Sequence, residues 1–348
     1  MTELVLIAGT RPEFVKLGPV AGCLRDLEVP FSVLCTGQHT TLLAGTPAET
    51  DLAFGDSLNI PSDGKITRYV RQAQAKIATW LTNHGLPTVV VQGDTMTAYA
   101  GAQAAAEAGC PLIHVEAGIR SGNPSEPFPE ERFRREITQL TDLHLTPTST
   151  TYANLMSEGV RPVTIKVTGN PVVSALARYA SASPMPPKPY VVVTLHRREL
   201  TERKDFNMIL VGLLDAMAGY PETTFLWPIH PRITIPKVSI PNVRFSGPLP
   251  YRQFISTLAS AQAVLTDSGG LCEEAATLGV PTVVYRNVTD RPEAVHAQIA
   301  QVVPVDHPQE AVRLAANPWV VRLPSPVFGT PDSALFCAEA IQSFVGTT

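Results

Sequence analysis

The sequence predicts an α/β protein built from two doubly wound parallel sheets. Short apolar runs alternate with amphipathic stretches along most of the chain, as expected when strands are joined by crossover helices. The alternation breaks once, at a proline-rich segment, and then restarts. The length of 348 residues is enough for two domains of ordinary size, each with its own core.

The first domain is predicted to span residues 1–180. Its apolar runs indicate strands at Leu4–Ala8, Phe31–Cys35, Thr88–Gln92, Leu112–Glu116, Leu143–Pro147 and Val163–Thr168. The stretches between them show helical periodicity, at Pro12–Leu24, Arg68–His84, Thr97–Ala108, Glu130–Gln139 and Pro171–Tyr179.

A linker is predicted at residues 181–189, because this segment has four prolines, small residues and no apolar periodicity. The second domain, residues 190–332, then repeats the alternation. Its predicted strands are Tyr190–Leu195, Thr224–Ile229, Val243–Phe245, Ala263–Thr266 and Thr282–Tyr285. Its predicted helices are Phe206–Met217, Tyr251–Ala261 and Leu271–Leu278. The tail, residues 333–348, forms one more helix that could pack back on the first domain.

Composition and charge exclude several classes of protein. A net charge of −4 and a pI near 6.1 do not indicate the excess of positive charge that binds nucleic acid. No apolar run is long enough to span a bilayer, and the first residues lack the basic start of a signal peptide. The five cysteines are scattered without a Cys-x-x-Cys pair, so neither a zinc site nor a disulfide framework is indicated. We therefore expect a cytoplasmic enzyme.

Three acidic residues follow predicted strands or lie in the loops beyond them. Asp94 comes after one strand, Glu116 ends the next, and Glu130 begins a helix soon afterwards. In open α/β sheets, ligands bind beyond the carboxyl ends of the strands. Each acid alone is as well explained as a helix cap or an ion-pair partner. Together they favour proton-transfer chemistry.

Two segments have the features of phosphate-binding turns. The first, at Gly9–Glu13, places Arg11 at a helix N-terminus, with Lys16 one turn further. It lacks the G-x-G-x-x-G pattern, so a nicotinamide cofactor is not indicated. The second follows a strand and turns through Ser268, Gly269 and Gly270 into a helix, where amides and the helix dipole suit a diphosphate. Glu274, one turn into this helix, could hold ribose hydroxyls.

Basic side chains follow other strands of the second domain. His196 and Arg197 end its first strand, and Arg291 follows a later one. A His and Arg at a strand end suit phosphate contact or general acid work, although a solvated basic turn explains them equally simply. His230 also follows a strand and is as well explained as a loop or core histidine.

The segments together resemble the non-hydrolysing UDP-N-acetylglucosamine 2-epimerases, in order and roughly in spacing, from Leu4 to about Val295. The segments that carry the resemblance are Gly9–Glu13, Gly93–Thr95, His114–Gly118, Pro129–Glu131, Thr168–Pro171, His196–Glu199, Asp267–Gly270 and Arg291–Val295. The combination is highly specific, although single motifs would not be.

The resemblance implies a fold like that of the GT-B glycosyltransferases, with the nucleotide in an interdomain cleft. It implies interconversion of UDP-N-acetylglucosamine and UDP-N-acetylmannosamine by anti elimination of UDP and re-addition to a bound 2-acetamidoglucal. It also implies a homodimer and no cofactor or metal. The implied acid/base set is Asp94, Glu116 and Glu130, with His196 near the diphosphate. The implied UDP or phosphate ligands are Arg11, Ser268, Gly269, Gly270, Glu274 and Arg291, with Lys16 as a weaker phosphate candidate. Further candidates are Gln38, His39, Arg134, Arg197 and His230.

The chain departs from the family pattern at several positions. Gln92, Leu200, Phe133 and Cys272 stand where the family usually has His, Asn, Asn and Gln. The segment Thr36–His39 matches, but the residues after it do not. In bacterial members this segment helps to form an activating UDP-N-acetylglucosamine site. The departures therefore indicate either loss of allosteric activation or a changed sugar.

Three other functions compete with epimerisation. A hydrolysing 2-epimerase would release UDP and N-acetylmannosamine, and sequence separates it poorly from the leading hypothesis. A glycosyltransferase on the same fold would need an acceptor groove. A non-catalytic nucleotide-sugar sensor would be expected to lack the acids, which are all present.

Overall fold

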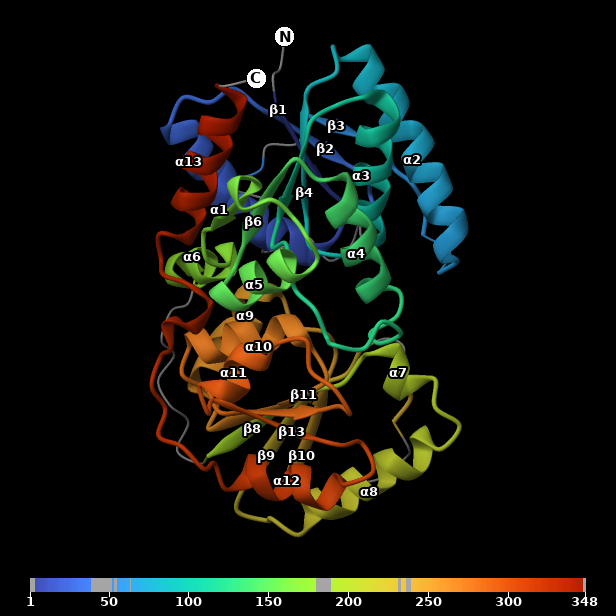
Figure 1. Ribbon diagram of the computed structural model, residues 1–348. Helices are drawn as coiled ribbons and strands as arrows, with labels where there is room; N and C mark the ends of the chain where they lie inside the picture. The colour runs from blue at the N-terminus through green and yellow to red at the C-terminus, as the bar shows by residue number, and fades with distance from the viewer. Residues whose placement is uncertain are drawn as a thin grey trace. The chain divides into compact units, whose positions relative to one another are not determined.

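The computed structural model describes residues 4–38, 52, 55–62, 64–179, 189–230, 233–235 and 239–346. The chain divides into two compact units (Figure 1). Unit 1 comprises Met1–Arg178 and Gly329–Thr348, and unit 2 comprises Tyr179–Phe328. Most of the predicted linker, residues 181–188, lies outside the described part of the chain.

Unit 1 contains a seven-stranded parallel sheet in the order β3-β2-β1-β4-β5-β6-β7. The strands are β1 Leu4–Ala8, β2 Ser32–Cys35, β3 Asp56–Ser57, β4 Thr88–Gln92, β5 Leu112–Val115, β6 Leu143–Thr146 and β7 Ile165–Val167. The central strands are buried on both faces, which explains why they read as continuous apolar runs.

Helices cover both faces of this sheet. The helices of unit 1 are α1 Arg11–Asp26, α2 Ile66–Asn83, α3 Met96–Ala108, α4 Glu130–Leu140, α5 Ser149–Ser157, α6 Pro171–Tyr179 and α13 Ser333–Val345. One apolar cluster joins α1 and α13 to the sheet, and another joins α2, α3 and α4 to it. The C-terminal helix α13, red in Figure 1, lies beside α1, in blue.

Unit 2 contains a six-stranded parallel sheet in the order β10-β9-β8-β11-β12-β13. The strands are β8 Tyr190–Thr194, β9 Thr224–Pro228, β10 Val243–Ser246, β11 Ala263–Thr266, β12 Thr282–Tyr285 and β13 Ala300–Val303. The helices are α7 Arg198–Thr201, α8 Phe206–Ala218, α9 Tyr251–Ser260, α10 Gly269–Thr277, α11 Pro292–His296 and α12 Pro308–Ala316. Trp227 and Phe225 of β9 lie fully buried in its main core.

The predicted fold class is confirmed, because both sheets are parallel and alternate with helices. In each sheet the order of the strands reverses at one point, between β1 and β4 in unit 1 and between β8 and β11 in unit 2. Such a switch point is where open α/β sheets bind ligands. None of the described helices is long and apolar enough to cross a membrane.

Candidate active site

Most of the predicted site residues follow strands that flank these switch points or lie next to them in the sheet. They follow β1, β4 and β5 in unit 1 and β8, β11 and β12 in unit 2, whereas Gln38 follows β2 and His230 follows β9.

Glu116 of unit 1 is a buried carboxylate held by three side chains from distant parts of the sequence. Its Oε1 lies 2.6 Å from Lys16 Nζ and 3.4 Å from Asn170 Nδ2, and its Oε2 accepts a hydrogen bond from Gln92. The side chains of Glu116 and Lys16 are only 4% and 7% exposed. A buried carboxylate requires such partners. Lys16, predicted as a phosphate ligand, therefore contacts the acid in this structure.

The backbone of Glu116 is in the left-handed region, with φ of 67°, which is uncommon for a residue with a side chain. Such local strain occurs most often at functional sites. The conformation turns the chain immediately after β5. A Cβ atom on Gly93, after β4, would lie 3.6 Å from Glu116 Oε2. The turn that carries Asp94 therefore lies directly beside the Glu116 carboxylate.

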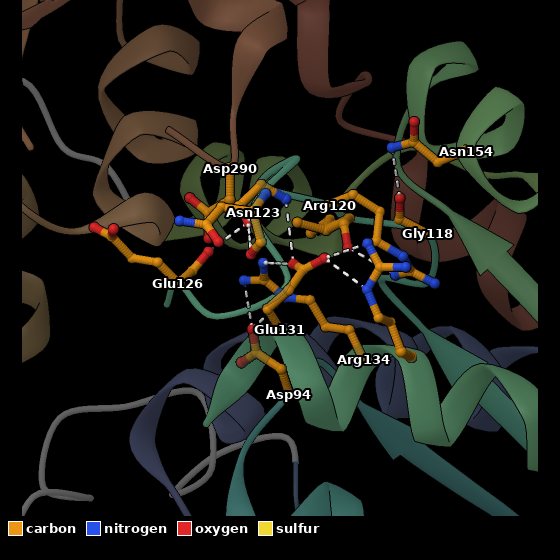
Figure 2. A network of polar contacts seen from close by, with 12 residues as sticks. Asp94, Gly118, Arg120, Asn123, Glu126, Glu131, Arg134, Asn154 and Asp290 are labelled. Atoms are coloured by element: carbon orange, nitrogen blue, oxygen red, sulfur yellow. Dashed lines mark hydrogen bonds and ion pairs between the residues drawn. The ribbon is translucent and has the colours of Figure 1, made fainter. Parts of the chain in front are cut away.

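Asp94 is held by Arg134 of α4 (Figure 2). Its Oδ2 lies 2.7 Å from Arg134 Nε and 2.6 Å from Nη2. The third guanidinium nitrogen lies 3.3 Å from Glu131 Oε2. Charge-assisted bonds with a guanidinium are strong and directional. Arg134 therefore fixes the orientation of Asp94, which still exposes 26% of its side chain.

Glu130 and Glu131 differ in their surroundings. Glu130 is half-buried at the first position of α4. Glu131 is fully buried, accepts from the backbone N–H of Ser121 at 3.2 Å and lies 3.1 Å from Arg135. Its contacts hold the loop after β5 against α4. The sequence offered no signal to distinguish the two glutamates in this way.

The first turn of α1 contains a second fully buried carboxyl group, Glu13. Arg11, the predicted phosphate ligand, is half-buried in the same turn. Burial raises the pKa of Glu13 from 4.5 to about 7, although hydrogen bonds from Thr95, Gly9 and Thr10 oppose the shift. Sequence reasoning gave Glu13 no role.

His114 supports the turn that precedes Asp94. Its Nε2 lies 2.8 Å from the carbonyl oxygen of Gly93, so this nitrogen donates the hydrogen bond. Burial lowers the pKa of His114 to about 4. The ring is therefore neutral near pH 7 and is suited to orienting the backbone rather than transferring protons.

Gln38 follows β2 and lies in a cluster of hydroxyl groups that packs against the turn after β1. Thr97 Oγ1 donates to Gln38 Oε1 at 2.9 Å and lies 2.9 Å from Thr36 Oγ1. Tyr69 donates to Thr36 at 2.9 Å. His39 lies outside the described residues.

In unit 2, Asp267 anchors the turn that carries His196 and Arg197. Its fully buried carboxylate accepts from the backbone N–H of His196 at 2.9 Å and of Arg197 at 2.8 Å. The His196 Nδ1 atom lies 3.4 Å from Asp267 Oδ1, and 37% of the His196 side chain is exposed. The rings of His196 and His230 stack with centroids 5.8 Å apart. The structure therefore brings these two predicted histidines together.

The N-terminus of α10 has the form predicted for an anion site. Ser268 is its N-cap and accepts from the backbone N–H of Leu271 at 3.4 Å. No described heavy atom lies within 4 Å of where a Gly270 Cβ would stand, so that side of the turn is open. On the next turn, Glu274 accepts from the hydroxyl of Tyr251 at 3.0 Å.

Arg291 occupies a more enclosed position than the other predicted UDP ligands. It is 6% exposed, and its Nε lies 2.5 Å from Glu273 and its Nη1 3.2 Å from Asp290. A Cβ on Gly269 would lie 2.7 Å from Asp290 Oδ1, so this ion-pair group packs directly under the start of α10. Arg291 is thus placed to support the turn from within unit 2.

Three departures from the family pattern are buried. Leu200 packs in the apolar core of unit 2, the ring of Phe133 stacks on Tyr99 with centroids 4.3 Å apart, and Cys272 Sγ donates to the carbonyl oxygen of Ser268 at 3.3 Å. Gln92 is also buried but contacts Glu116 directly. Among the described residues, no group of three or more His, Cys, Asp or Glu side chains is arranged to hold a metal ion.

Comparisons with known proteins agree over most of the chain. A family model described as UDP-N-acetylglucosamine 2-epimerase matches residues 23–322. The chain is 33% identical over 328 residues to the UDP-N-acetylglucosamine 2-epimerase of Escherichia coli K12, with 87% of each chain covered. It is 32% identical over 327 residues to the probable UDP-N-acetylglucosamine 2-epimerase of Ralstonia nicotianae, again with 87% of each covered.

A solved structure gives the same result in three dimensions. The UDP-GlcNAc 2-epimerase of Neisseria meningitidis, solved bound to UDP-GlcNAc, matches with a TM-score of 0.88 at 27% identity. The match covers 98% of this chain and 99% of that one.

Proposed function

We propose, because this chain belongs to the UDP-N-acetylglucosamine 2-epimerase family, that it interconverts UDP-N-acetylglucosamine and UDP-N-acetylmannosamine without net hydrolysis. The supporting observation is the cage around Glu116, a buried carboxylate held by Lys16, Gln92 and Asn170 beside the turn of Asp94. Relatives of this chain are named UDP-N-acetylglucosamine 2-epimerases, and one was solved with UDP-GlcNAc bound.

The proposed reaction has two balanced steps. A carboxylate takes the proton from C2 of the sugar while the C1–O bond breaks, so that UDP leaves with the bonding electrons and 2-acetamidoglucal remains. In the second step the diphosphate oxygen re-forms the bond to C1, and an acid delivers a proton to the opposite face of C2. A single proton donor cannot serve both faces, so more than one acid is needed.

The acids of unit 1 are assigned to the proton transfers. Glu116, whose carboxyl group lies 2.6 Å from the ammonium of Lys16, is our choice for the base that removes the C2 proton. A positioned carboxylate suits a weakly acidic C–H group, because the base needs no rearrangement before reaction. Asp94 and Glu130 are assigned to deliver the proton to the opposite face of C2. In the reverse reaction they remove the proton from that face.

The residues of unit 2 are assigned to the UDP group. The N-terminal amides of α10 and the hydroxyl of Ser268 bind the diphosphate, and His196 stabilises the charge that develops on it. Glu274 holds the ribose hydroxyls, and Arg11 of unit 1 adds a cation for the phosphates. No cofactor or metal takes part in this scheme.

Proton NMR of the purified protein with UDP-N-acetylglucosamine tests the proposal. We expect a mixture of the two UDP-sugars, with the same equilibrium reached from either one. Accumulation of free UDP and N-acetylmannosamine would instead identify a hydrolysing 2-epimerase. If neither sugar changes while UDP still binds, epimerisation of this substrate is excluded and sugars with other C4 or C6 substituents become the next to test.

A further inference from the structure

Glu13 makes hydrogen bonds to two separate turns of unit 1. Its Oε2 accepts from the backbone N–H groups of Gly9 at 2.8 Å and Thr10 at 2.7 Å, and from the Thr10 hydroxyl at 2.9 Å. Its Oε1 accepts from the hydroxyl of Thr95 at 2.5 Å. The first three contacts lie within the β1–α1 turn, whereas Thr95 belongs to the β4–α3 turn, 82 residues away.

Each turn carries a residue of the proposed site. Arg11 follows Thr10 in the first turn, and Asp94 precedes Thr95 in the second. Thr95 is also the N-cap of α3, where its hydroxyl accepts from the backbone N–H of Ala98 at 3.0 Å. The bond between Glu13 and Thr95 therefore fixes the start of α3 as well as the turn before it.

Little space remains for the two turns to shift. A Cβ atom on Gly9 would lie 1.9 Å from Thr36 Oγ1 and 2.5 Å from Thr97 Oγ1. The backbone of the first turn is therefore already in close contact with α3 and the end of β2. Glu13 lies within this packing with no exposed surface, so water cannot replace its contacts.

We propose that Glu13 is a positioning residue, which holds Arg11 and Asp94 in fixed relative positions by hydrogen-bonding both turns at once. The inference rests on the proposed function, in which Asp94 transfers a proton and Arg11 binds phosphate. Glu13 itself does not touch the substrate in this scheme. A displacement of about 1 Å at a reacting group can lower turnover about 100-fold, which gives the scale of the expected effect.

The protonation state of Glu13 affects the direction of one hydrogen bond. Cys35 of β2 and Tyr69 of α2 face Glu13, and the pKa of both is raised by burial and, to a smaller extent, by the charge of Glu13. Arg11 and Lys16 lie on the same helix as Glu13, and Asp94, which pairs with Arg134, precedes Thr95 in the chain. Burial raises the pKa of Cys35 above its usual value and that of Tyr69 to about 12, so both are neutral near pH 7.

Glu13 is ionised above about pH 7 and then accepts from Thr95. Below that pH its own O–H on Oε1 donates to Thr95 Oγ1, and Oε2 still accepts from the first turn. The two turns remain joined in both forms. A glutamine side chain can reproduce the neutral form, because its amide N–H replaces the acid O–H.

Substitution of Thr95 can remove the hydrogen bond that joins the two turns while the Glu13 side chain stays in place. Thr95→Val should lower kcat about 30- to 100-fold, because Asp94 loses its support. The dissociation constant for UDP should stay within about twofold, since the contacts of Gly9 and Thr10 remain. Thr95→Ser keeps the hydroxyl and should recover most of kcat. Glu107, exposed on the same helix, provides a matched control, and Glu107→Gln should behave like the wild type.

Substitutions at Glu13 give the complementary pattern. Glu13→Ala removes every contact, so it should lower kcat and also weaken UDP binding. Glu13→Gln should stay within about threefold of the wild type in both quantities near pH 6. Assays are run far below the unfolding temperature, and circular dichroism checks the folded fraction. A lower kcat then cannot result from unfolding of the variant. Equal losses in Thr95→Val and Thr95→Ser, or unchanged kcat in Glu13→Ala, would overturn the inference.

A measurement without substrate keeps this test independent of the proposed function. The 13C signal of the Glu13 carboxyl group, assigned by its absence in Glu13→Gln, should titrate near pH 7 in the wild type. It should titrate at higher pH in Thr95→Val, because the Thr95 hydroxyl bond lowers the pKa. A titration that Thr95→Val leaves unchanged would show that the two turns are not joined through Glu13. If the protein does not catalyse the proposed reaction, the titration of Glu13 should still shift in Thr95→Val.

Discussion

The switch-point turns of unit 1 and the α10 turn of unit 2 are built differently. In unit 1 the carboxylates of Glu13, Glu116 and Glu131 are buried and held by several donors. In unit 2 Asp267 is likewise buried and held by backbone donors, but the space beside Gly270 is open and 37% of the His196 side chain is exposed. The first arrangement fixes groups in advance of reaction, and the second leaves donors available for a ligand. The difference matches the division of roles that we propose.

The largest expected effect is the loss of turnover in Glu116→Gln. The amide keeps the size of the side chain but cannot accept the C2 proton, so kcat should fall about 1,000-fold, within the range of general acid–base catalysis. The dissociation constant for UDP, measured by calorimetry, should stay within about twofold. Turnover near that of the wild type would remove Glu116 from the mechanism.

The next effect concerns the pH dependence of stability. The folded-state pKa of Glu13 is raised to about 7 from 4.5, so its contribution to stability is fully present below about pH 4.5. This contribution is lost as the pH rises through 7. The loss between pH 5 and pH 8 is roughly 2.5 kcal/mol.

Urea unfolding of the wild type and Glu13→Gln at pH 5 and pH 8 measures this contribution. Between pH 5 and pH 8 the free energy of unfolding should fall by roughly 2.5 kcal/mol more in the wild type than in Glu13→Gln. Equal slopes in the two proteins would mean that Glu13 titrates near its ordinary pKa.

A smaller effect is expected from Arg134→Lys. Lysine keeps the positive charge but loses the paired bonds of the guanidinium to Asp94, and the two residues are not equivalent at such sites. We expect kcat to fall about 30-fold, which corresponds to about 2 kcal/mol, while UDP binding is unchanged. Arg132→Lys, on the exposed side of α4, is the matched control and should leave kcat unaltered. An Arg134→Lys enzyme as fast as this control would show that Asp94 needs no such support.

The smallest effect should follow Ser268→Ala in unit 2. Loss of one hydroxyl from the α10 turn should weaken UDP binding about fivefold, or about 1 kcal/mol. Isothermal titration with UDP measures this directly. An unchanged dissociation constant would mean that Ser268 acts only as the helix cap seen here.

The sequence predicted most of the strands, because they depend on local patterns, but β3 Asp56–Ser57 and β13 Ala300–Val303 were not predicted. Thr88–Gln92 has three consecutive valines at its centre, and the structure places a strand over the same residues. The helix Ser149–Ser157 was not predicted, since it begins with hydroxyl residues whose capping by Thr148 gives only a weak signal. Pro308–Ala316 was also missed, although its proline at the start and its apolar spacing could have indicated a helix.

Partners of the acids could not be predicted in the same way. Lys16 and Glu116 are 100 residues apart, and Glu13 and Thr95 are 82 apart. Nothing in the local sequence shows which cation or hydroxyl reaches which carboxylate, because tertiary packing decides it. For this reason Lys16 was predicted at the phosphates, and Glu13 was given no role.

The most direct test of the account is proton exchange at C2 in D₂O. Wild-type protein incubated with UDP-N-acetylglucosamine should form UDP-N-acetylmannosamine that carries deuterium at C2, while Glu116→Gln forms almost none. Product that retains protium at C2, or exchange at the wild-type rate in Glu116→Gln, would contradict the assignment of this buried carboxylate as the base.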